Sequence, residues 1–510
     1  MKTRVISVLL LCLLVQVAVV GQQVAPEPGF DEYVINAMKE WEVPGLAIAI
    51  VKDDRIIFAK GYGVRELGGT AAVDEHTLFA IGSSSKAFTA AALAILVDEG
   101  KVKWDDPVTK YLPGFQLFDP YATREMTVRD LVTHRSGLER GDLLWYASPY
   151  DRNEVLRRVR FLKPSWSVRS RFGYQNIMYL AAGQIQPAVL GKEWDDVVRE
   201  RIFVPLGMNE SNTSIRKFAG IDNVASPHSK IDDKLQKVSW RNIDNIGPAG
   251  SINSNVTDMA QWVRMHLGGG TYEKKKVLSA ASVKEMQTPQ TVIRIEGQNE
   301  RLYPEAHFLN YGLGWFLSDF RGRKLVEHGG AIDGMRSEVA MLPEEKLGVV
   351  ILTNRGGSVL PHVLMYRVFD AYLNVAKRDW STEISKKIKA LEEQAKAAEK
   401  KVEDERVKGT SPSLAIEKYA GTYQNEMYGE TKFAVKDGKL TSEFGPNFNG
   451  ELEHWHYDTF RVVWRDPMEG KGFVVFKLNA RGKPETVTID GLGDFTRVPD
   501  KPAPGAVSSN

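Results

Sequence analysis

Cysteine is nearly absent from this sequence. Its 510 residues include one cysteine, Cys12, which lies in an N-terminal segment that we expect to be removed. A mature chain without thiols excludes disulfides, cysteine nucleophiles and cysteine-ligated metal sites. An excess of one charge is also lacking, because 67 basic and 65 acidic residues leave a net charge of +2. No basic stripe with interleaved aromatic residues is present, so we expect no nucleic-acid partner.

The motifs of several enzyme classes are missing as well. The sequence holds no HExxH zinc motif, no GxxxxGK phosphate loop and no GxSxG nucleophile elbow. Residues 453–456, EHWH, place two histidines on one side of an expected strand without further ligands nearby. This pattern is more typical of ordinary surface than of a metal site. We therefore expect neither a metal nor a cofactor.

The N-terminus has the layout of a secretory signal peptide. A basic start is followed by an apolar run from Val5 to Val20, then by Gly21 and a polar stretch. The alternative is a retained membrane anchor, but the run is short for a span. We expect residues 1–21 to be cleaved, leaving a secreted or periplasmic protein without a stable membrane span.

Residues 22–378 are expected to form one α+β domain. Residues 46–64 contain two β-rich runs around a turn at Lys52–Asp54, and residues 336–354 contain a second such pair. The stretch between them is mainly helical and rich in loops. Strands from both ends of a domain commonly join one sheet while the middle forms a helical lobe, which leaves a cleft between the two.

The C-terminal part changes character twice. Residues 379–411 are highly charged and carry one apolar seam, which indicates a helical linker. The seam either docks on the body of the protein or supports a homo-oligomer. The β-rich segment that follows is the second candidate for a contact between copies. Residues 412–500 contain short strands with Asp-Gly and Arg-Gly turns and predict a small all-β barrel or sandwich. Residues 501–510 are expected to be a disordered tail.

One lysine stands out in an apolar helix. From Ala87 to Val97 only Thr89 is polar, yet Lys86 lies in the first turn, three residues after Ser83 and on the same face. A buried ammonium is costly unless it is paired or gives up its proton. Either the helix end is exposed and Lys86 points into water, or Lys86 is a base beside a serine nucleophile.

Spacing alone does not choose among the candidate motifs. Ser-x-x-Lys, Tyr-x-Asn and His-x-Gly each recur, at Ser214–Lys217, Tyr372–Asn374, Tyr423–Asn425 and His266–Gly268. Context favours Ser83, which follows a β-rich approach and opens a buried helix whose positive end suits an oxyanion. Context likewise favours Tyr174, at the start of an apolar helix, and His328, beside two glycines before the second hairpin.

Nine blocks in a fixed order then connect these motifs. They include VPGLAIAIV, TLFAIGSSSKAFTA, MTVRDLVTHRSGL, FGYQN, GPAGSINSNVTDMAQW and HGGAIDG. Over residues 30–375 the chain resembles the serine β-lactamase and penicillin-binding-protein superfamily, in particular its class C β-lactamase, D-peptidase and esterase branch. The resemblance implies an antiparallel sheet flanked by helices with a helical lobe. The C-terminal region resembles the lipocalin-like β domain often appended in this branch.

The resemblance implies a role for each catalytic residue. Ser83 would be the nucleophile and form an acyl-enzyme, and Lys86, with a lowered pKa, would relay its proton. Tyr174 would act with Lys86 as general base and then protonate the leaving group. Asn176 would orient the substrate amide and hydrogen-bond Lys86.

The third motif departs from the family pattern. The usual Lys-Thr-Gly is matched by His328, Gly329 and Gly330, and the N–H of Ala331 would complete the oxyanion hole with that of Ser83. A histidine is mostly uncharged near neutral pH, so the positive charge that meets a substrate carboxylate in penicillin-recognising members is lost. The hydroxyl of the middle residue is lost too, although Arg336 could restore a charge near the cleft.

Three functional hypotheses follow. The first is a secreted serine hydrolase acting on small esters, amides or peptides with D-residues. The second is a true β-lactamase or D-alanyl-D-alanine carboxypeptidase, and the changes at His328 and Gly329 weaken the case for efficient β-lactam hydrolysis. The third is a non-catalytic envelope peptide-binding protein, which the presence of Ser83, Lys86 and Tyr174 disfavours.

Overall fold

The structure is a computed structural model that describes residues 25–445 and 448–499. The predicted signal peptide, residues 1–21, and the predicted tail, residues 501–510, lie outside these residues. Across the described ranges, no helix combines the length and the apolar character that a membrane span requires.

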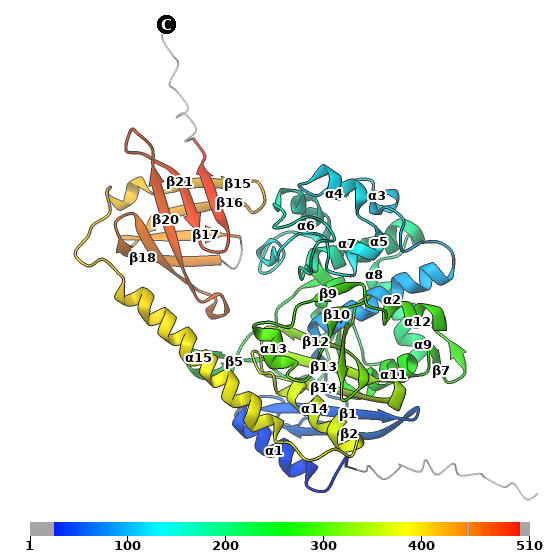
Figure 1. Cartoon of the computed structure of the whole chain (residues 1–510). Coiled ribbons are helices and arrows are strands. Elements are labelled where there is room, and N and C mark those ends of the chain that lie inside the picture. The colour runs from blue at the N-terminus through cyan, green and yellow to red at the C-terminus, as the bar shows by residue number, and fades with distance from the viewer. Residues whose placement is uncertain (1–24, 446–447, 500–510) are drawn as a thin grey trace, which may run out of the picture.

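An eight-stranded antiparallel sheet forms the centre of the larger domain (Figure 1), in the order β2-β1-β14-β13-β12-β11-β10-β9. Both predicted hairpins are confirmed, and the first turns through Asp53 and Asp54, which both have positive φ as a two-residue type I′ turn requires. Strands from the two ends of the domain meet where β1 pairs with β14. The strands are β1 Gly45–Lys52, β2 Arg55–Gly63, β9 Thr291–Ile293, β10 Leu309–Tyr311, β11 Phe316–Phe320, β12 Arg323–Ile332, β13 Met335–Leu342 and β14 Leu347–Thr353.

Helices cover both faces of this sheet, so its central strands are apolar on both sides. One set of alternating β1 residues, Leu46 among them, packs with α1 and α14, whereas the other set, including Ala47, packs with α2 and α11. This double burial explains why β1 reads as a continuous apolar run. The helices are α1 Phe30–Glu40, α2 Ser85–Asp98, α11 Val256–Leu267 and α14 Leu360–Tyr372.

The helical lobe lies between β2 and β9 in sequence and covers one end of α2 (Figure 1). Every residue of α2 from Ser85 to Leu96 is buried, which confirms the all-round apolar helix. The lobe and its neighbours contain α3 Val108–Tyr111, α4 Pro120–Glu125, α5 Val128–Leu131, α6 Arg152–Arg158, α7 Asn176–Leu190, α8 Trp194–Val198, α9 Val204–Leu206, α10 Gly247–Gly250, α12 Ala280–Met286 and α13 Gln298–Leu302. Short strand pairs are β3 Phe79–Ala80 with β6 Asn253–Ser254, β4 His228–Ile231 with β5 Lys234–Lys237, and β7 Thr271–Tyr272 with β8 Lys275–Lys276.

The charged linker forms one long helix, α15 Trp380–Asp404, which runs from the body toward the C-terminal domain (Figure 1). Its apolar seam docks on the body at its start, where Trp380 stacks on Tyr366 of α14 with ring centroids 4.7 Å apart and Ile384 is buried. Farther along, Val402 is exposed. Association of copies through this helix or the following domain stays a prediction.

The C-terminal domain is a closed eight-stranded barrel, which decides between the predicted barrel and sandwich. Closure comes from pairing of β15 with β22, and aromatic side chains such as Tyr423, Phe433 and Phe476 pack inside. The predicted α+β fold with an appended all-β domain is therefore confirmed. The strands are β15 Gly421–Asn425, β16 Gly429–Lys436, β17 Lys439–Phe444, β18 Phe448–His456, β19 Thr459–Trp464, β20 Lys471–Leu478, β21 Pro484–Ile489 and β22 Gly493–Arg497.

Polar contacts join the barrel to the larger domain. Arg241 contacts Asp333, just after β12, through Nε at 2.8 Å and Asp466 of the barrel through Nη2 at 2.8 Å. The hydroxyl of Tyr150 in the lobe donates to the carbonyl of Tyr428 at 2.7 Å. The loop between β15 and β16 and the loop after β19 therefore both rest against the larger domain.

Candidate active site

Ser83 and Lys86 meet at the start of α2. Ser83 lies in a 3₁₀ turn, Gly82–Ser84, that leads directly into the helix, and its side chain is partly exposed. The Lys86 side chain is fully buried, and its Nζ lies 2.9 Å from Ser83 Oγ and 2.8 Å from the carbonyl oxygen of Ala249. Of the two sequence-based alternatives for Lys86, exposure to water is thus wrong.

Burial determines the charge of Lys86. Burial, reinforced by the positive charge of Arg140 and opposed by the negative charge of Asp142, lowers the pKa of Lys86 well below its usual value. A neutral amine can donate one hydrogen to the Ala249 carbonyl while its lone pair accepts the hydroxyl hydrogen of Ser83. This arrangement is that of a base beside a nucleophile.

Tyr174 lies on the other side of the same pair. The ring centroid is 4.8 Å from Lys86 Nζ, and its hydroxyl interacts with Ser83. Burial raises the pKa of Tyr174 above its usual value, although the hydrogen bond with Ser83 opposes the shift. The phenol is therefore protonated at neutral pH and can donate a proton, while Lys86 is the group able to accept one.

His134 supports Tyr174 from behind. The two rings lie 4.2 Å apart between centroids, and His134 Nδ1 accepts a hydrogen bond from the N–H of Gln175 at 3.0 Å. The carbonyl of His134 accepts from the N–H of Gly173 at 2.8 Å. Its backbone adopts φ +54°, uncommon for a residue with a side chain. Because His134 brackets Tyr174 on both sides, its role is positional.

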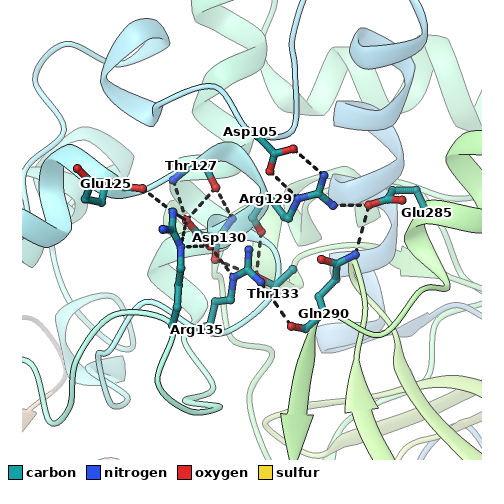
Figure 2. A network of polar contacts seen from close by, with 10 residues as sticks. Asp105, Glu125, Thr127, Arg129, Asp130, Thr133, Arg135, Glu285 and Gln290 are labelled. Carbon is teal, nitrogen blue, oxygen red and sulfur yellow. Dashed lines mark hydrogen bonds and ion pairs between the residues drawn. The ribbon is translucent and has the colours of Figure 1, made fainter.

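A buried carboxylate anchors the His134 loop (Figure 2). Asp130 accepts hydrogen bonds from Arg135 at 2.5 Å and from Arg169 at 2.7 Å, and it closes a capping box with Thr127 at the start of α5. Arg135 and Arg169 flank the segments that carry His134 and Tyr174. The network continues through Arg129 to Asp105 and Glu285.

Loss of the Asp130 charge is expected to destabilise the lobe. Asp130→Asn leaves Arg135 and Arg169 without their buried counter-charge and should lower the free energy of unfolding by about 2–3 kcal/mol at pH 7. Thermal unfolding followed by circular dichroism measures this loss. The control is Asp105→Asn, since Asp105 belongs to the same network but its side chain is 71% exposed, and it should cost under about 1 kcal/mol.

The stability difference between wild type and Asp130→Asn is expected to depend on pH. Burial would raise the pKa of Asp130, but hydrogen bonds from Arg169 and Thr127 and the charge of Arg135 outweigh it, so the pKa lies below its ordinary 3.8. The stabilisation is therefore present above the unfolded pKa and is lost as pH falls through the folded pKa. The gap between wild type and Asp130→Asn should close in acid, and a gap that stays constant below pH 3.8 would contradict the assignment.

Two glycines bring β12 against the turn that carries Ser83. A Cβ on Gly330 would collide with the carbonyl oxygen of Ile81, and a Cβ on Gly82 would lie 2.6 Å from the nitrogen of Ala331. Ser84 Oγ donates to the carbonyl of His328 at 2.8 Å, which ties turn and strand together. The exposed Ala331 thus lies beside the nucleophile turn, as the oxyanion assignment requires.

The predicted hydrogen bond between Asn176 and Lys86 is not present in the structure. Asn176 Nδ2 donates to Asp142 Oδ1 at 2.8 Å, whereas Lys86 bonds Ser83 and Ala249 instead of Asn176. Asp142 competes successfully because it is a charged acceptor. Asn176 occupies the first turn of α7, and the cap itself is Gln175.

His328 is more enclosed than a substrate-contacting residue. Its Nε2 lies 2.9 Å from the Tyr311 hydroxyl and its Nδ1 lies 2.7 Å from the Gly329 carbonyl, so neither ring nitrogen is free for a substrate. Burial is the main cause that lowers the pKa of His328, to about 3. The ring is therefore neutral and faces inward, which agrees with the predicted loss of positive charge at this position.

The described residues include one group with metal-ligand chemistry, behind β12. Ligand atoms of Glu327, Glu338 and His362 all lie within 4.8 Å of one another in a buried position. Tyr303 donates to Glu327, and His362 Nδ1 lies 3.3 Å from Glu338. Burial raises the pKa of Glu338 to about 7, so the adjacent carboxyls can share a proton. The expected absence of a metal stays a prediction.

Comparisons with known proteins agree with this geometry. Residues 30–372 match the β-lactamase family, and residues 405–500 match a domain of unknown function, DUF3471. The unguisins hydrolase of Aspergillus campestris is 31% identical over 422 residues, which cover 78% of this chain and 76% of that protein. Penicillin-binding protein 4 of Amycolatopsis lactamdurans is 29% identical over 326 residues, 62% of this chain and 82% of the relative.

Solved structures share the fold over both domains. The octameric penicillin-binding protein homologue from Pyrococcus abyssi has a TM-score of 0.61 at 21% identity and covers 92% of this chain and 99% of its own. SurE has a TM-score of 0.54 at 19% identity, with 92% and 98% covered. By its family match, its relatives and its fold, this chain belongs to the β-lactamase and penicillin-binding-protein-like family of serine hydrolases.

Proposed function

We propose that the protein is a secreted hydrolase that forms an acyl-enzyme on Ser83 and cleaves small esters, amides or peptides bearing D-residues. The observation that carries this proposal is the buried Lys86 amine, 2.9 Å from Ser83 Oγ. Two relatives named as unguisins hydrolases support hydrolysis as the activity. Secretion rests on the predicted signal peptide alone.

Acylation assigns one task to each residue. Lys86 takes the proton of Ser83 Oγ as this oxygen bonds to the substrate carbonyl carbon, and the resulting oxyanion is held by the N–H groups of Ser83 and Ala331. The tetrahedral intermediate collapses by breaking the bond to the leaving group. The Tyr174 phenol protonates that group and regains its proton from Lys86.

Deacylation repeats these steps with water as the nucleophile. Lys86 takes a proton from water, whose oxygen bonds to the acyl carbon, and the same N–H groups stabilise the second oxyanion. The bond from the acyl carbon to Ser83 Oγ breaks, and the proton returns to this oxygen. The product is a carboxylic acid, and the free enzyme is restored.

The two other hypotheses are weaker on specific grounds. A true β-lactamase or D-alanyl-D-alanine carboxypeptidase of the usual type relies on a fixed positive charge at the third motif, and His328 is neutral and enclosed. A peptide-binding protein without turnover has no need of a desolvated amine beside a serine hydroxyl.

An active-site-directed fluorophosphonate tests the proposal directly. The wild-type protein should acquire one equivalent of label, and peptide mapping by mass spectrometry should place it on Ser83. Turnover of p-nitrophenyl esters and D-aminoacyl amides should exceed turnover of nitrocefin. A label elsewhere, or none, would contradict the acyl-enzyme, and tight peptide binding without label would support the binding protein. Preferred nitrocefin turnover would instead indicate a β-lactamase.

A further inference from the structure

A buried group of three side chains lies on the face of the central sheet that α14 covers. Glu327 of β12, Glu338 of β13 and His362 of α14 offer ligand atoms that all lie within 4.8 Å of one another. Side chains alternate along β12, so Glu327 lies on the opposite face from His328 and from the turn that carries Ser83. The group is therefore separate from the active site, and the mechanism does not use it.

The hydrogen bonds of His362 leave its Nδ1 with a free lone pair. The Nε2 atom lies 2.9 Å from the carbonyl oxygen of Leu302, and because a carbonyl can only accept, this nitrogen carries the hydrogen. Burial lowers the pKa of His362, so the ring is neutral and Nδ1 is an acceptor. Nδ1 nevertheless lies 3.3 Å from Glu338 Oε2, which is also an acceptor when ionised. Two buried acceptors that face each other need a proton or a cation between them.

The other oxygen of Glu338 also lacks a donor. Glu338 is 5% exposed, and its Oε1 atom has no hydrogen-bond partner among the residues that the structure describes. Glu327, the carboxyl that interacts with it, already accepts a hydrogen bond from the Tyr303 hydroxyl. Arg336 supplies charge to Glu338 but no hydrogen bond to Oε1. A buried carboxylate oxygen without a partner is costly, which indicates a bound group that completes it.

The spacing of the acceptors favours a metal ion over a shared proton. A hydrogen bond that joins nitrogen and oxygen spans about 2.7–3.2 Å. Two ligands of a tetrahedral zinc ion, with bonds of about 2.0–2.1 Å, lie roughly 3.3–3.4 Å apart. The 3.3 Å between His362 Nδ1 and Glu338 Oε2 matches the second distance. In addition, two ionised carboxylates balance the charge of one divalent cation.

Neighbouring groups hold two of the three ligands in place. The Tyr303 hydroxyl donates to Glu327, and the Leu302 carbonyl accepts from Nε2 of His362. The Tyr366 hydroxyl donates to the same carbonyl at 2.7 Å, which fixes the segment over the group. Hydrogen bonds of this kind set the tautomer and the orientation of residues that bind metals.

We propose that Glu327, Glu338 and His362 bind one divalent metal ion, with Zn²⁺ favoured by a ligand set of one imidazole and two carboxylates. The ion joins β12, β13 and α14 on the far face of the sheet from Ser83, so it stabilises the fold and takes no part in acyl transfer. The inference is independent of the proposed function. It replaces the sequence-based expectation that the chain holds no metal, which considered short motifs and not residues from three separate elements.

Metal content and thermal stability of the full chain test this site. Wild type that is stripped with EDTA and then dialysed against Zn²⁺ should retain about one equivalent by elemental mass spectrometry. Its melting temperature should rise with the Zn²⁺ concentration and fall again with EDTA, because the ion binds the folded state. Glu338→Gln keeps the side-chain size but removes a charged ligand, and it should weaken Zn²⁺ binding by at least about 10-fold.

The matched control is His307→Gln. His307 pairs with Asp319 at 2.7 Å and its side chain is 80% exposed, so this variant removes a surface histidine beside a carboxylate and should still retain the ion. Retention by Glu338→Gln together with loss in His307→Gln would assign the binding to the surface and overturn the buried site.

Wild type alone decides the outcome if Glu338→Gln does not fold. Failure to retain Zn²⁺, Mn²⁺ or Co²⁺, with no rise in melting temperature, overturns the metal site and leaves a proton shared between the carboxyls. Fluorophosphonate should label Ser83 equally in the stripped and the loaded enzyme. Labelling that requires the ion would overturn its purely structural role.

Discussion

Ser83→Ala is expected to lower kcat/KM for an ester substrate by about 10⁴-fold or more, because the residual rate comes only from binding and oxyanion stabilisation. Lys86→Met should cause a loss of similar size, since methionine fills the buried space without accepting a proton. The double variant should be no slower than either single variant, because the two side chains act as one unit. Steady-state hydrolysis of p-nitrophenyl esters measures all three.

The pH profile separates a base from a structural lysine. Because the Lys86 pKa is lowered, the wild-type amine is neutral over more of the pH range, and activity should fall as pH drops through that pKa. Residual activity of Lys86→Met should lack this acidic limb. A Lys86→Met variant with near wild-type rates, or two single losses that multiply in the double variant, would show that Lys86 is not the base.

Gly330→Ala is expected to lower kcat by about 10²- to 10³-fold, the loss typical of one oxyanion donor. The new Cβ would collide with the backbone carbonyl of Ile81, which cannot move aside as a flexible side chain can. β12 would have to shift away from the turn before α2 and take the N–H of Ala331 with it.

The matched control is Gly114→Ala. A Cβ at Gly114 meets nothing within 4 Å and its φ lies outside the left-handed region, so activity and stability should stay near wild type. Fluorophosphonate labelling rates and thermal unfolding of both variants distinguish a misplaced donor from general unfolding. Normal labelling of Gly330→Ala would show that β12 supplies no essential donor.

Local pattern was enough to predict most of the architecture. The turn at Lys52–Asp54, the apolar helix after Ser83 and the repeated short strands after residue 412 each have a periodicity or turn chemistry of their own. The choice of Ser83 over Ser214 also followed from context. In the structure Ser214 caps a short 3₁₀ turn and bonds Asp244, while Lys86 lies beside Ser83.

Contacts between distant segments were not predictable in the same way. Asp142 and Tyr311 belong to no periodic pattern, yet they bind Asn176 and His328 and so decide where those side chains point. The direction of His328 depends on which face of β12 it occupies, and strand register fixes this only once the sheet has formed. Resemblance to a family transfers residue types to positions but not the partners of each side chain.

The contact of Arg241 with both Asp333 and Asp466 has a consequence for how the enzyme can be divided. Asp333 directly follows β12, so the barrel holds the end of the same strand whose earlier residues face Ser83. A chain cut after α14 would keep Ser83, Lys86 and Tyr174 but would lose the acceptor that Asp466 provides and the loop that receives Tyr150. In such a fragment the larger domain alone would hold the end of β12 and the lobe segment around Tyr150.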